Sequence, residues 1–166
     1  MHDIPNTIHE TISGFNDCKI DMLTVHISGG EEMLKRAMLA GKFINTKVIG
    51  VSILTSLEEE DSLALFDNKL EDQISNLFKI AVKVNLDGIV CSPHELKIAN
   101  TILGSHLVKI TPGIRDIQVK DDQARTMSAK EAIERGSSFL VIGRPITKAE
   151  DITRALQDFN YSIHEK

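Results

Sequence analysis

Residues 107–115 read Leu-Val-Lys-Ile-Thr-Pro-Gly-Ile-Arg and join a short apolar run to a turn that ends on a cation. The run Leu107–Ile110 is typical of a buried strand, and Pro112-Gly113 predicts a turn. Four more runs rich in Val, Ile and Leu lie along the chain: Met22–His26, Lys47–Leu54, Leu86–Cys91 and Phe139–Ile142. Their apolar character is too continuous to alternate with polar residues, which predicts parallel strands covered on both faces.

Helical patterns separate these runs. In Leu70–Val84, apolar residues recur at helical spacing and form one face. Ser128–Glu131 and Thr147–Glu150 each match a capping box, and Gly136 is a typical helix stop. Thr7, or Asn6 before it, is expected to cap a first helix that carries Ile8, Ile12 and Phe15. Strands alternating with helices predict an α/β fold with a parallel sheet.

Two α/β architectures fit this alternation, an open doubly wound sheet and part of a (β/α)8 barrel. A dinucleotide-binding open sheet would favour Gly-x-Gly-x-x-Gly after its first strand, and the sequence has no such run. Polar clusters instead follow nearly every strand: 26–30, Thr55-Ser56, 92–94, 111–115 and 143–145. Function at the carboxyl ends of many strands is typical of TIM barrels. We therefore expect residues 1–166 to form one domain, an incomplete barrel with about five of the eight strands.

Composition narrows the function classes. The net charge is −5, with one tyrosine, no tryptophan and no basic stripe, which argues against nucleic-acid binding. No apolar run reaches the length of a membrane span, and the N-terminus lacks a signal-peptide pattern. Cys18 and Cys91 lie far apart without metal-ligand spacing, so buried free thiols and a reducing cytoplasm are expected.

The last two strands carry the strongest signals for a bound phosphate. Gly143-Arg144-Pro145 opens the final helix, where a glycine allows close approach of an anion and a guanidinium can grip its oxygens. Arg115 follows the preceding strand and predicts a second cation at the same site. The polar segment Asp116–Arg125 is either a mobile lid or a loop without consequence, and composition does not separate the two.

Other polar groups favour structural interpretations. His26 ends the first strand without a second histidine or carboxylate at ligand spacing, so a satisfied structural histidine is expected rather than a metal ligand. The acidic run Glu58–Asp61 is expected to be a solvated loop. Residues 2–7, taken alone, indicate a frayed N-terminus that leads into a helix cap.

Seven segments together resemble one family. HDIPNT, VHISGG, ILTS, DGIVCSPHE, VKITPGIR, DQARTM and VIGRPIT occur here in the order and approximate spacing of bacterial orotidine 5'-phosphate decarboxylases. Each motif is weak alone, but the ordered set is specific and spans essentially the whole chain. The resemblance implies a TIM barrel that works as a homodimer, without metal or organic cofactor, and converts orotidine 5'-phosphate to UMP and CO2. This reaction is the last step of de novo pyrimidine nucleotide synthesis.

The resemblance also implies site residues. The family's charged array contains two lysines and two aspartates, and Asp3 matches the aspartate that one subunit donates to its partner's site. Ile4 and Thr7 match residues that accompany that aspartate. Thr55 and Ser56 match the loop that contacts the base and ribose. Arg115, Gln123, Gly143 and Arg144 match the phosphate-binding set, with Gln123 on the closing loop.

The family's pattern continues on the N-terminal side of His2, where its catalytic lysine would fall immediately before Met1. Three of the four array members and three of the eight strands are therefore absent from residues 1–166. Three hypotheses follow: an enzyme whose recorded chain is short, an inactive remnant that at most binds nucleoside monophosphates, and one half of a split enzyme. A different barrel enzyme acting on a phosphorylated sugar is the chemical alternative.

Overall fold

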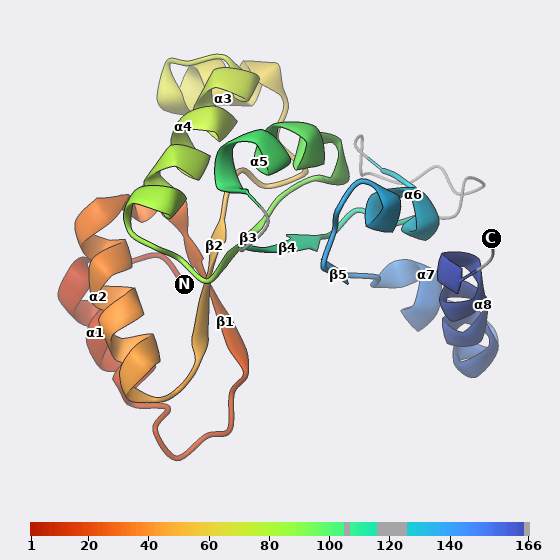
Figure 1. Ribbon diagram of the computed structural model, residues 1–166, viewed down its shortest axis with the longest axis horizontal. Coiled ribbons are helices and arrows are strands. Elements are labelled where there is room, and N and C mark those ends of the chain that lie inside the picture. Colours follow the sequence, from red (N-terminus) through yellow and green to blue (C-terminus); the bar gives the residue numbers. More distant parts are fainter. Residues whose placement is uncertain (105–106, 116–125, 165–166) are drawn as a thin grey trace.

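The computed structural model describes residues 1–104, 107–115 and 126–164, and these contain one sheet of five parallel strands (Figure 1). The strands are β1 Met22–His26, β2 Lys47–Val51, β3 Gly88–Val90, β4 Val108–Thr111 and β5 Phe139–Leu140. They lie side by side in chain order, β1-β2-β3-β4-β5. Doubly wound sheets reverse their strand order at a switch point, whereas barrel strands follow the chain. The predicted parallel α/β fold of barrel type is confirmed.

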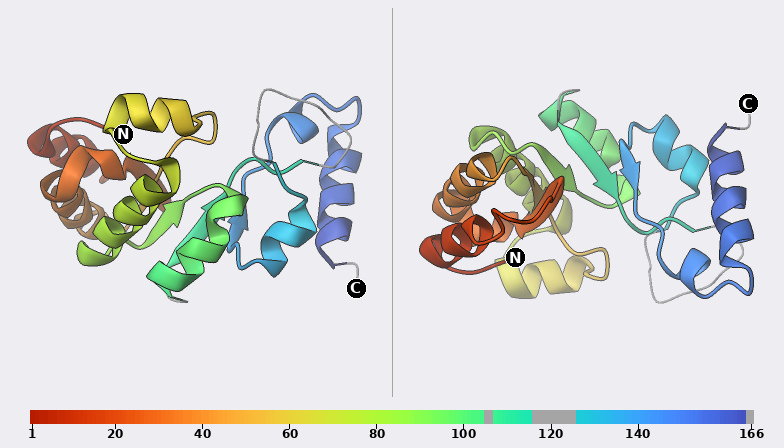
Figure 2. Two further views of the ribbon diagram at one scale, coloured as in Figure 1. Left: turned by 90° about the horizontal axis from the view of Figure 1, so that it is seen from above. Right: turned by 90° about the horizontal axis from the view of Figure 1, so that it is seen from below.

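Eight helices and two 3-10 turns connect the strands within the described residues. The helices are α1 Pro5–Ser13, α2 Gly30–Phe43, α3 Glu59–Phe66, α4 Leu70–Lys83, α5 Leu96–Leu103, α6 Ala129–Glu134, α7 Arg144–Thr147 and α8 Ile152–His164, and the turns are η1 Ile27–Gly29 and η2 Pro93–Glu95. In Figures 1 and 2, α1 and α2 lie side by side at one end of the molecule, and α6, α7 and α8 gather at the other. None of these helices has the length and apolarity needed to cross a bilayer.

The two faces of the sheet differ in burial. Leu23 and Val25 of β1 are buried and point toward the helices, whereas Met22 and His26 are half-buried and point the other way. We call this second face the open face. Residues that are paired on neighbouring strands project from the same face, so the pairing identifies the open face on every strand. Its carboxyl-terminal row is set by the register and consists of His26, Val51, Val90, Ile110 and Phe139.

The hydrophobic core consists of two clusters. The larger cluster runs from Ile8 to Leu107 and includes the fully buried Phe78. The smaller cluster lies between α6, α8 and the loop after β4, and is built around Ile114 and Phe159. Outside both clusters, the buried hydroxyls of Thr111 and Ser137 form a hydrogen bond of 2.6 Å.

Several predicted boundaries are confirmed. The helix predicted over Leu70–Val84 forms as α4, and Gly136 ends α6 with φ of 98°. Ser128 caps α6, since its hydroxyl accepts from the Glu131 N–H. In a capping box the Glu131 carboxylate would also accept from the Ser128 N–H. It pairs instead with Arg135 at 2.6 Å. β2 and β5 are shorter than predicted and end at Val51 and Leu140.

The prediction that Asn6 or Thr7 caps the first helix is wrong. The helix begins at Pro5, with Ile4 in the cap position. Proline is favoured at the first helical position because its φ is already helical and its missing N–H costs no hydrogen bond there. The Asp3 carboxylate accepts from the Ile4 N–H at 2.7 Å, which places a polar side chain just before the helix.

Two further predictions are corrected by helix-end chemistry. The acidic run Glu58–Asp61 is exposed but is no loop: it opens α3, where Glu58 and Asp61 form a reciprocal capping box. Carboxylates are favoured there because they satisfy free N–H groups and the positive end of the helix dipole. The capping box predicted at Thr147 is also wrong. Thr147 ends α7, and α8 begins later, where the Asp151 carboxylate accepts from the Arg154 N–H.

Candidate active site

The first three residues run beside the open edge of β1. The Met1 nitrogen donates to the Thr24 carbonyl at 2.7 Å, and the His26 N–H donates to the Met1 carbonyl at 2.9 Å. This pair of bonds is the pattern of a parallel ladder and places Met1 beside Val25. Because side chains alternate along a strand, His2 then falls beside His26 on the open face.

His2 and His26 are stacked. Their ring centroids lie 5.5 Å apart with 27° between the ring planes. Burial lowers the pKa of His26, and the neighbouring His2 lowers it further. A lowered pKa favours the neutral form of His26, which reduces charge repulsion within the stack. In the described part of the chain, no group of three His, Cys, Asp or Glu side chains is arranged to hold a metal ion.

The residues expected to reach a partner subunit, Asp3, Ile4 and Thr7, come after His2 in the chain. Asp3 and Ile4 are exposed, Ile4 at 67%, and Thr7 lies exposed in the first turn of α1. A shallow cavity of about 470 Å³ lies beside them. Its lining residues are His2, Asp3, Ile4, Pro5, Ser28 and Gly29. Among the described residues, the cavity thus contains Asp3 and Ile4 but not Arg115, Gly143 or Arg144, which are expected to bind phosphate.

Thr55 and Ser56 lie in the turn between β2 and α3. The turn is closed by the Leu57 N–H, which donates to the Leu54 carbonyl at 3.0 Å. Thr55 is half-buried and Ser56 is exposed. Both residues therefore lie just beyond the carboxyl end of β2, the strand next to β1.

Arg115 follows β4 and is 6% exposed. Gly113 turns the chain with φ of 79°, a left-handed conformation that favours glycine. The Arg115 N–H donates to the Met127 carbonyl and the Met127 N–H to the Gly113 carbonyl, which ties both segments together. The Arg115 guanidinium also donates to the Ile114 carbonyl at 2.8 Å. Gln123 and the rest of the predicted lid, 116–125, lie outside the described residues.

Gly143 and Arg144 open the short helix α7 after β5. The N–H groups of Ile146 and Thr147 donate to the Gly143 carbonyl. A Cβ placed on Gly143 would meet nothing within 4 Å, so the space beside it is open, and Arg144 is half-buried. This open backbone next to a cation suits the approach of an anionic group.

Strand topology explains why these residues belong to one site region. All five strands are parallel, so the segments after β1, β2, β4 and β5 emerge at the same edge of the sheet. In Figure 1, β1 and β2 lie toward one end of the sheet, and β4 and β5 lie toward the other.

Sequence reasoning did not find a buried polar network below this edge. The Glu95 carboxylate accepts from the Ser92 N–H at 3.2 Å and from the Ser52 hydroxyl at 3.4 Å, and all three residues are buried. The capping pattern Ser-x-x-Glu at 92–95 was the available signal. Burial raises the pKa of the adjacent Cys91 thiol, and the Glu95 charge raises it further.

A parallel sheet with chain-order strands and phosphate-suited loops at its carboxyl edge defines the class of (β/α)-barrel enzymes. Within that class, the chain belongs to the orotidine 5'-phosphate decarboxylase / HUMPS family, whose model matches residues 1–159. It is therefore a member of a carboxy-lyase family.

Individual relatives agree with this assignment. The orotidine 5'-phosphate decarboxylase of Prochlorococcus marinus subsp. pastoris is 44% identical over 98% of this chain and 72% of its own length. That of a Wolbachia species from Brugia malayi is 44% identical over 90% of this chain and 67% of its own. The crystal structure of the Lactobacillus acidophilus decarboxylase superposes with a TM-score of 0.83 at 33% identity, and covers 99% of this chain and 73% of that one.

Proposed function

We propose that the protein acts in the decarboxylation of orotidine 5'-phosphate to UMP and CO2, the last step of de novo UMP synthesis. One observation carries the proposal. The chain belongs to this family, and its described residues that match the family's site all lie near one edge of one parallel sheet, either beyond a strand or in the segment beside β1. In this reaction the bond between C6 and the carboxylate breaks, and the electron pair left on C6 takes up a proton. A preorganised array of charges favours that change without covalent catalysis.

Residues 1–166 supply one member of the charged array, Asp3. The Arg115 and Arg144 guanidinium groups, with Gln123 and the Gly143 backbone, would hold the substrate phosphate. Thr55 and Ser56 would contact the base and ribose. Charged hydrogen bonds to a phosphate fix the substrate by a part that does not react, which orients C6 for the chemistry.

We further propose a homodimer in which Asp3, Ile4 and Thr7 enter the site of the neighbouring subunit. Their exposure supports this arrangement, since Ile4 presents 67% of its surface to solvent next to a charged residue. The Asp3 cavity, which is lined without Arg115 or Arg144, supports it as well. The free thiols Cys18 and Cys91 are in keeping with a cytoplasmic location.

Two measurements test the function. Calorimetry with UMP on the purified chain is expected to show saturable binding. Growth of a pyrimidine auxotroph that lacks the decarboxylase is expected when residues 1–166 are co-expressed with an N-terminal partner chain that carries the family's catalytic lysine, and to be lost with Asp3→Asn. A folded chain that does not bind UMP contradicts the proposal. UMP binding without rescue of growth identifies a nucleotide-binding protein instead of an enzyme.

The dimer is tested by sedimentation velocity. Ile4→Glu is expected to shift the protein toward monomer, because it would place a charge in the contact. Ile152→Glu is the matched control, since Ile152 is also exposed but lies in α8, at the other end of the molecule (Figure 1). Equal sedimentation of the native protein and both variants as monomers would rule out the proposed assembly.

A further inference from the structure

We propose that His26 is a positioning residue for Asp3, and that it acts through the stack between its imidazole ring and that of His2. The inference rests on the proposed function, in which Asp3 belongs to the charged array. His26 itself touches no substrate in this arrangement. Its role is to hold the segment that carries Asp3 at the carboxyl edge of the sheet.

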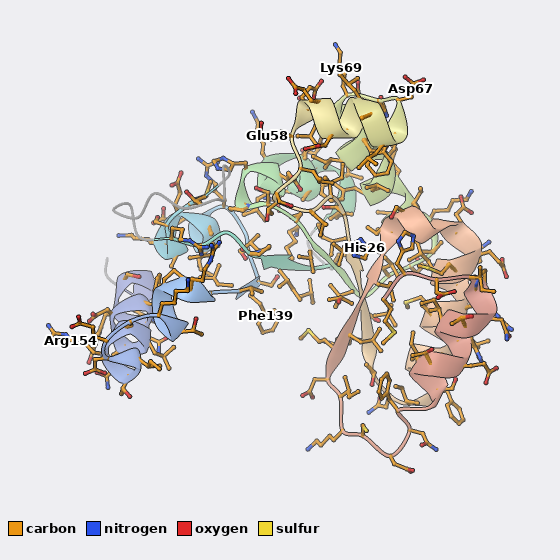
Figure 3. All side chains as sticks on the ribbon, turned by 180° about the vertical axis from the view of Figure 1, so that it is seen from behind. His26, Glu58, Asp67, Lys69, Phe139 and Arg154 are labelled. Atoms are coloured by element: carbon orange, nitrogen blue, oxygen red, sulfur yellow. The ribbon has the colours of Figure 1, made fainter. Side chains whose placement is uncertain are left out.

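Strand register brings the two rings together. Met1 pairs with Val25 through two ladder hydrogen bonds, so the next residues, His2 and His26, are cross-strand neighbours on the same face. The centroid distance of 5.5 Å and the interplanar angle of 27° are those of a stacked aromatic pair. Figure 3 labels His26 at the end of β1, and the burial pattern of this strand assigns its side chain to the open face.

Beyond Met1, the stack of His2 on His26 joins the segment that carries Asp3 to β1. Among the described residues, the ladder bonds to β1 stop at the Met1 carbonyl. The Asp3 carboxylate bonds locally, to the Ile4 N–H at 2.7 Å, and therefore does not tie Asp3 to the sheet. Asp3 comes directly after His2, so a rotation of the His2 backbone would move Asp3 with it.

The His2 ring also lies near Gly29 of η1. A Cβ on Gly29 would lie 3.2 Å from His2 Cδ2, and only 2.1 Å from Met33 Sδ. The His2 side chain is exposed, and its ring lies near both His26 and the backbone of η1. In this proposal the stack with His26 sets the direction in which Asp3 leaves the sheet.

Nuclear magnetic resonance on the full chain tests the positioning without requiring turnover. His26→Ala and His2→Ala each remove the stack, from opposite sides, whereas His26→Phe keeps an aromatic ring. Both alanine variants are expected to shift the Asp3 carboxyl resonance and to raise the exchange rate of the Ile4 N–H by about two- to tenfold, the effect of one lost aromatic pair. His26→Phe is expected to restore both signals.

Protection of the Leu23 and Val25 amides in every variant shows that β1 is intact. If Asp3 and Ile4 give unchanged signals in both alanine variants, the positioning role is overturned, whether or not the protein decarboxylates its substrate. If the native chain fails to bind UMP while these signals respond as expected, the proposed function is contradicted but the positioning role of His26 is supported.

Turnover is the second measurement, made on the co-expressed assembly that rescues growth. His26→Ala is expected to lower kcat by about ten- to a hundredfold, the effect of misplacing a catalytic group by about 1 Å, with UMP affinity unchanged. His26→Phe is expected to recover most of that loss. Full kcat in His26→Ala would contradict the proposal.

Discussion

The Nζ of Lys83, at the end of α4, donates to Glu31 Oε1 in the first turn of α2 over 2.7 Å. The pair joins two helices that are separated in the chain by β2 and α3. Glu31 immediately follows Gly30, so this ion pair anchors the segment after β1 that lines the Asp3 cavity. The hydrogen bond from Lys83 lowers the pKa of Glu31, and Lys35 adds to the effect.

Lys83→Ala is expected to raise the pKa of Glu31 toward its ordinary value, which carbon-detected titration of its carboxyl resonance measures. A carboxylate with a lowered pKa stabilises the fold above its ordinary pKa, and this stabilisation is lost as pH falls through the lowered value. The variant should therefore lose less stability in acid than the native protein. Lys79→Ala on the same helix is the control, since it leaves the pair intact.

Arg144→Ala is expected to weaken UMP binding by about 1.5–3 kcal/mol, the effect of losing hydrogen bonds between charged groups. Calorimetry measures the change. Arg154→Ala is the matched control, because Arg154 is an exposed arginine on α8 (Figure 3). Equal losses in both variants would indicate general charge attraction and would remove Arg144 from the phosphate site.

Gly88→Ala is expected to destabilise the sheet by about 1–3 kcal/mol in urea denaturation. A Cβ at residue 88 would lie 2.5 Å from the Val108 carbonyl oxygen and 2.9 Å from Val108 Cβ, and the backbone oxygen belongs to the paired strand. Gly14→Ala should be nearly neutral, because its Cβ would meet carbonyl oxygens only at 3.4 Å. A neutral Gly88→Ala would show that β3 and β4 can separate at little cost.

The two thiols are expected to differ in reactivity. Burial raises the pKa of Cys91, whereas Cys18 is exposed, so the prediction of a buried thiol is wrong for Cys18. Because the thiolate is the reacting form, a disulfide reagent should modify one thiol rapidly in the native protein and the second only after unfolding. The Cys18→Ser variant should react slowly when folded. Rapid reaction of that variant would mean that the segment around β3 opens readily.

Strand number, order and direction could be predicted from the sequence because buried parallel strands are short continuous apolar runs. Helix ends were harder to predict, since several side chains compete to cap the same N–H groups. At the first helix, Pro5 prevailed over Asn6 and Thr7, and near α8 Asp151 prevailed over Thr147. The acidic residues 58–61 were assigned to a loop because their charge indicated exposure to solvent. Carboxylates also cap the free N–H groups at the start of a helix, and that role was overlooked.

The motifs predicted which residues belong to the candidate site, but they did not predict how these residues are distributed along the sheet. The motifs give no distances, so they could not show that the Asp3 segment begins beside β1, whereas Arg115 follows β4, three strands along the sheet. The His2–His26 stack also escaped prediction. It depends on Met1 pairing with Val25, a register that no local pattern contains.

The division of the core into two clusters has a consequence for cooperativity. Amide exchange reports local opening, and regions that do not share buried apolar contacts can open with different free energies. The Ile114–Phe159 cluster is the smaller of the two, so we expect the part that carries Arg115 and Arg144 to open as a separate unit. Phosphate bound between these arginines would slow exchange there while leaving the amides around Phe78 unchanged.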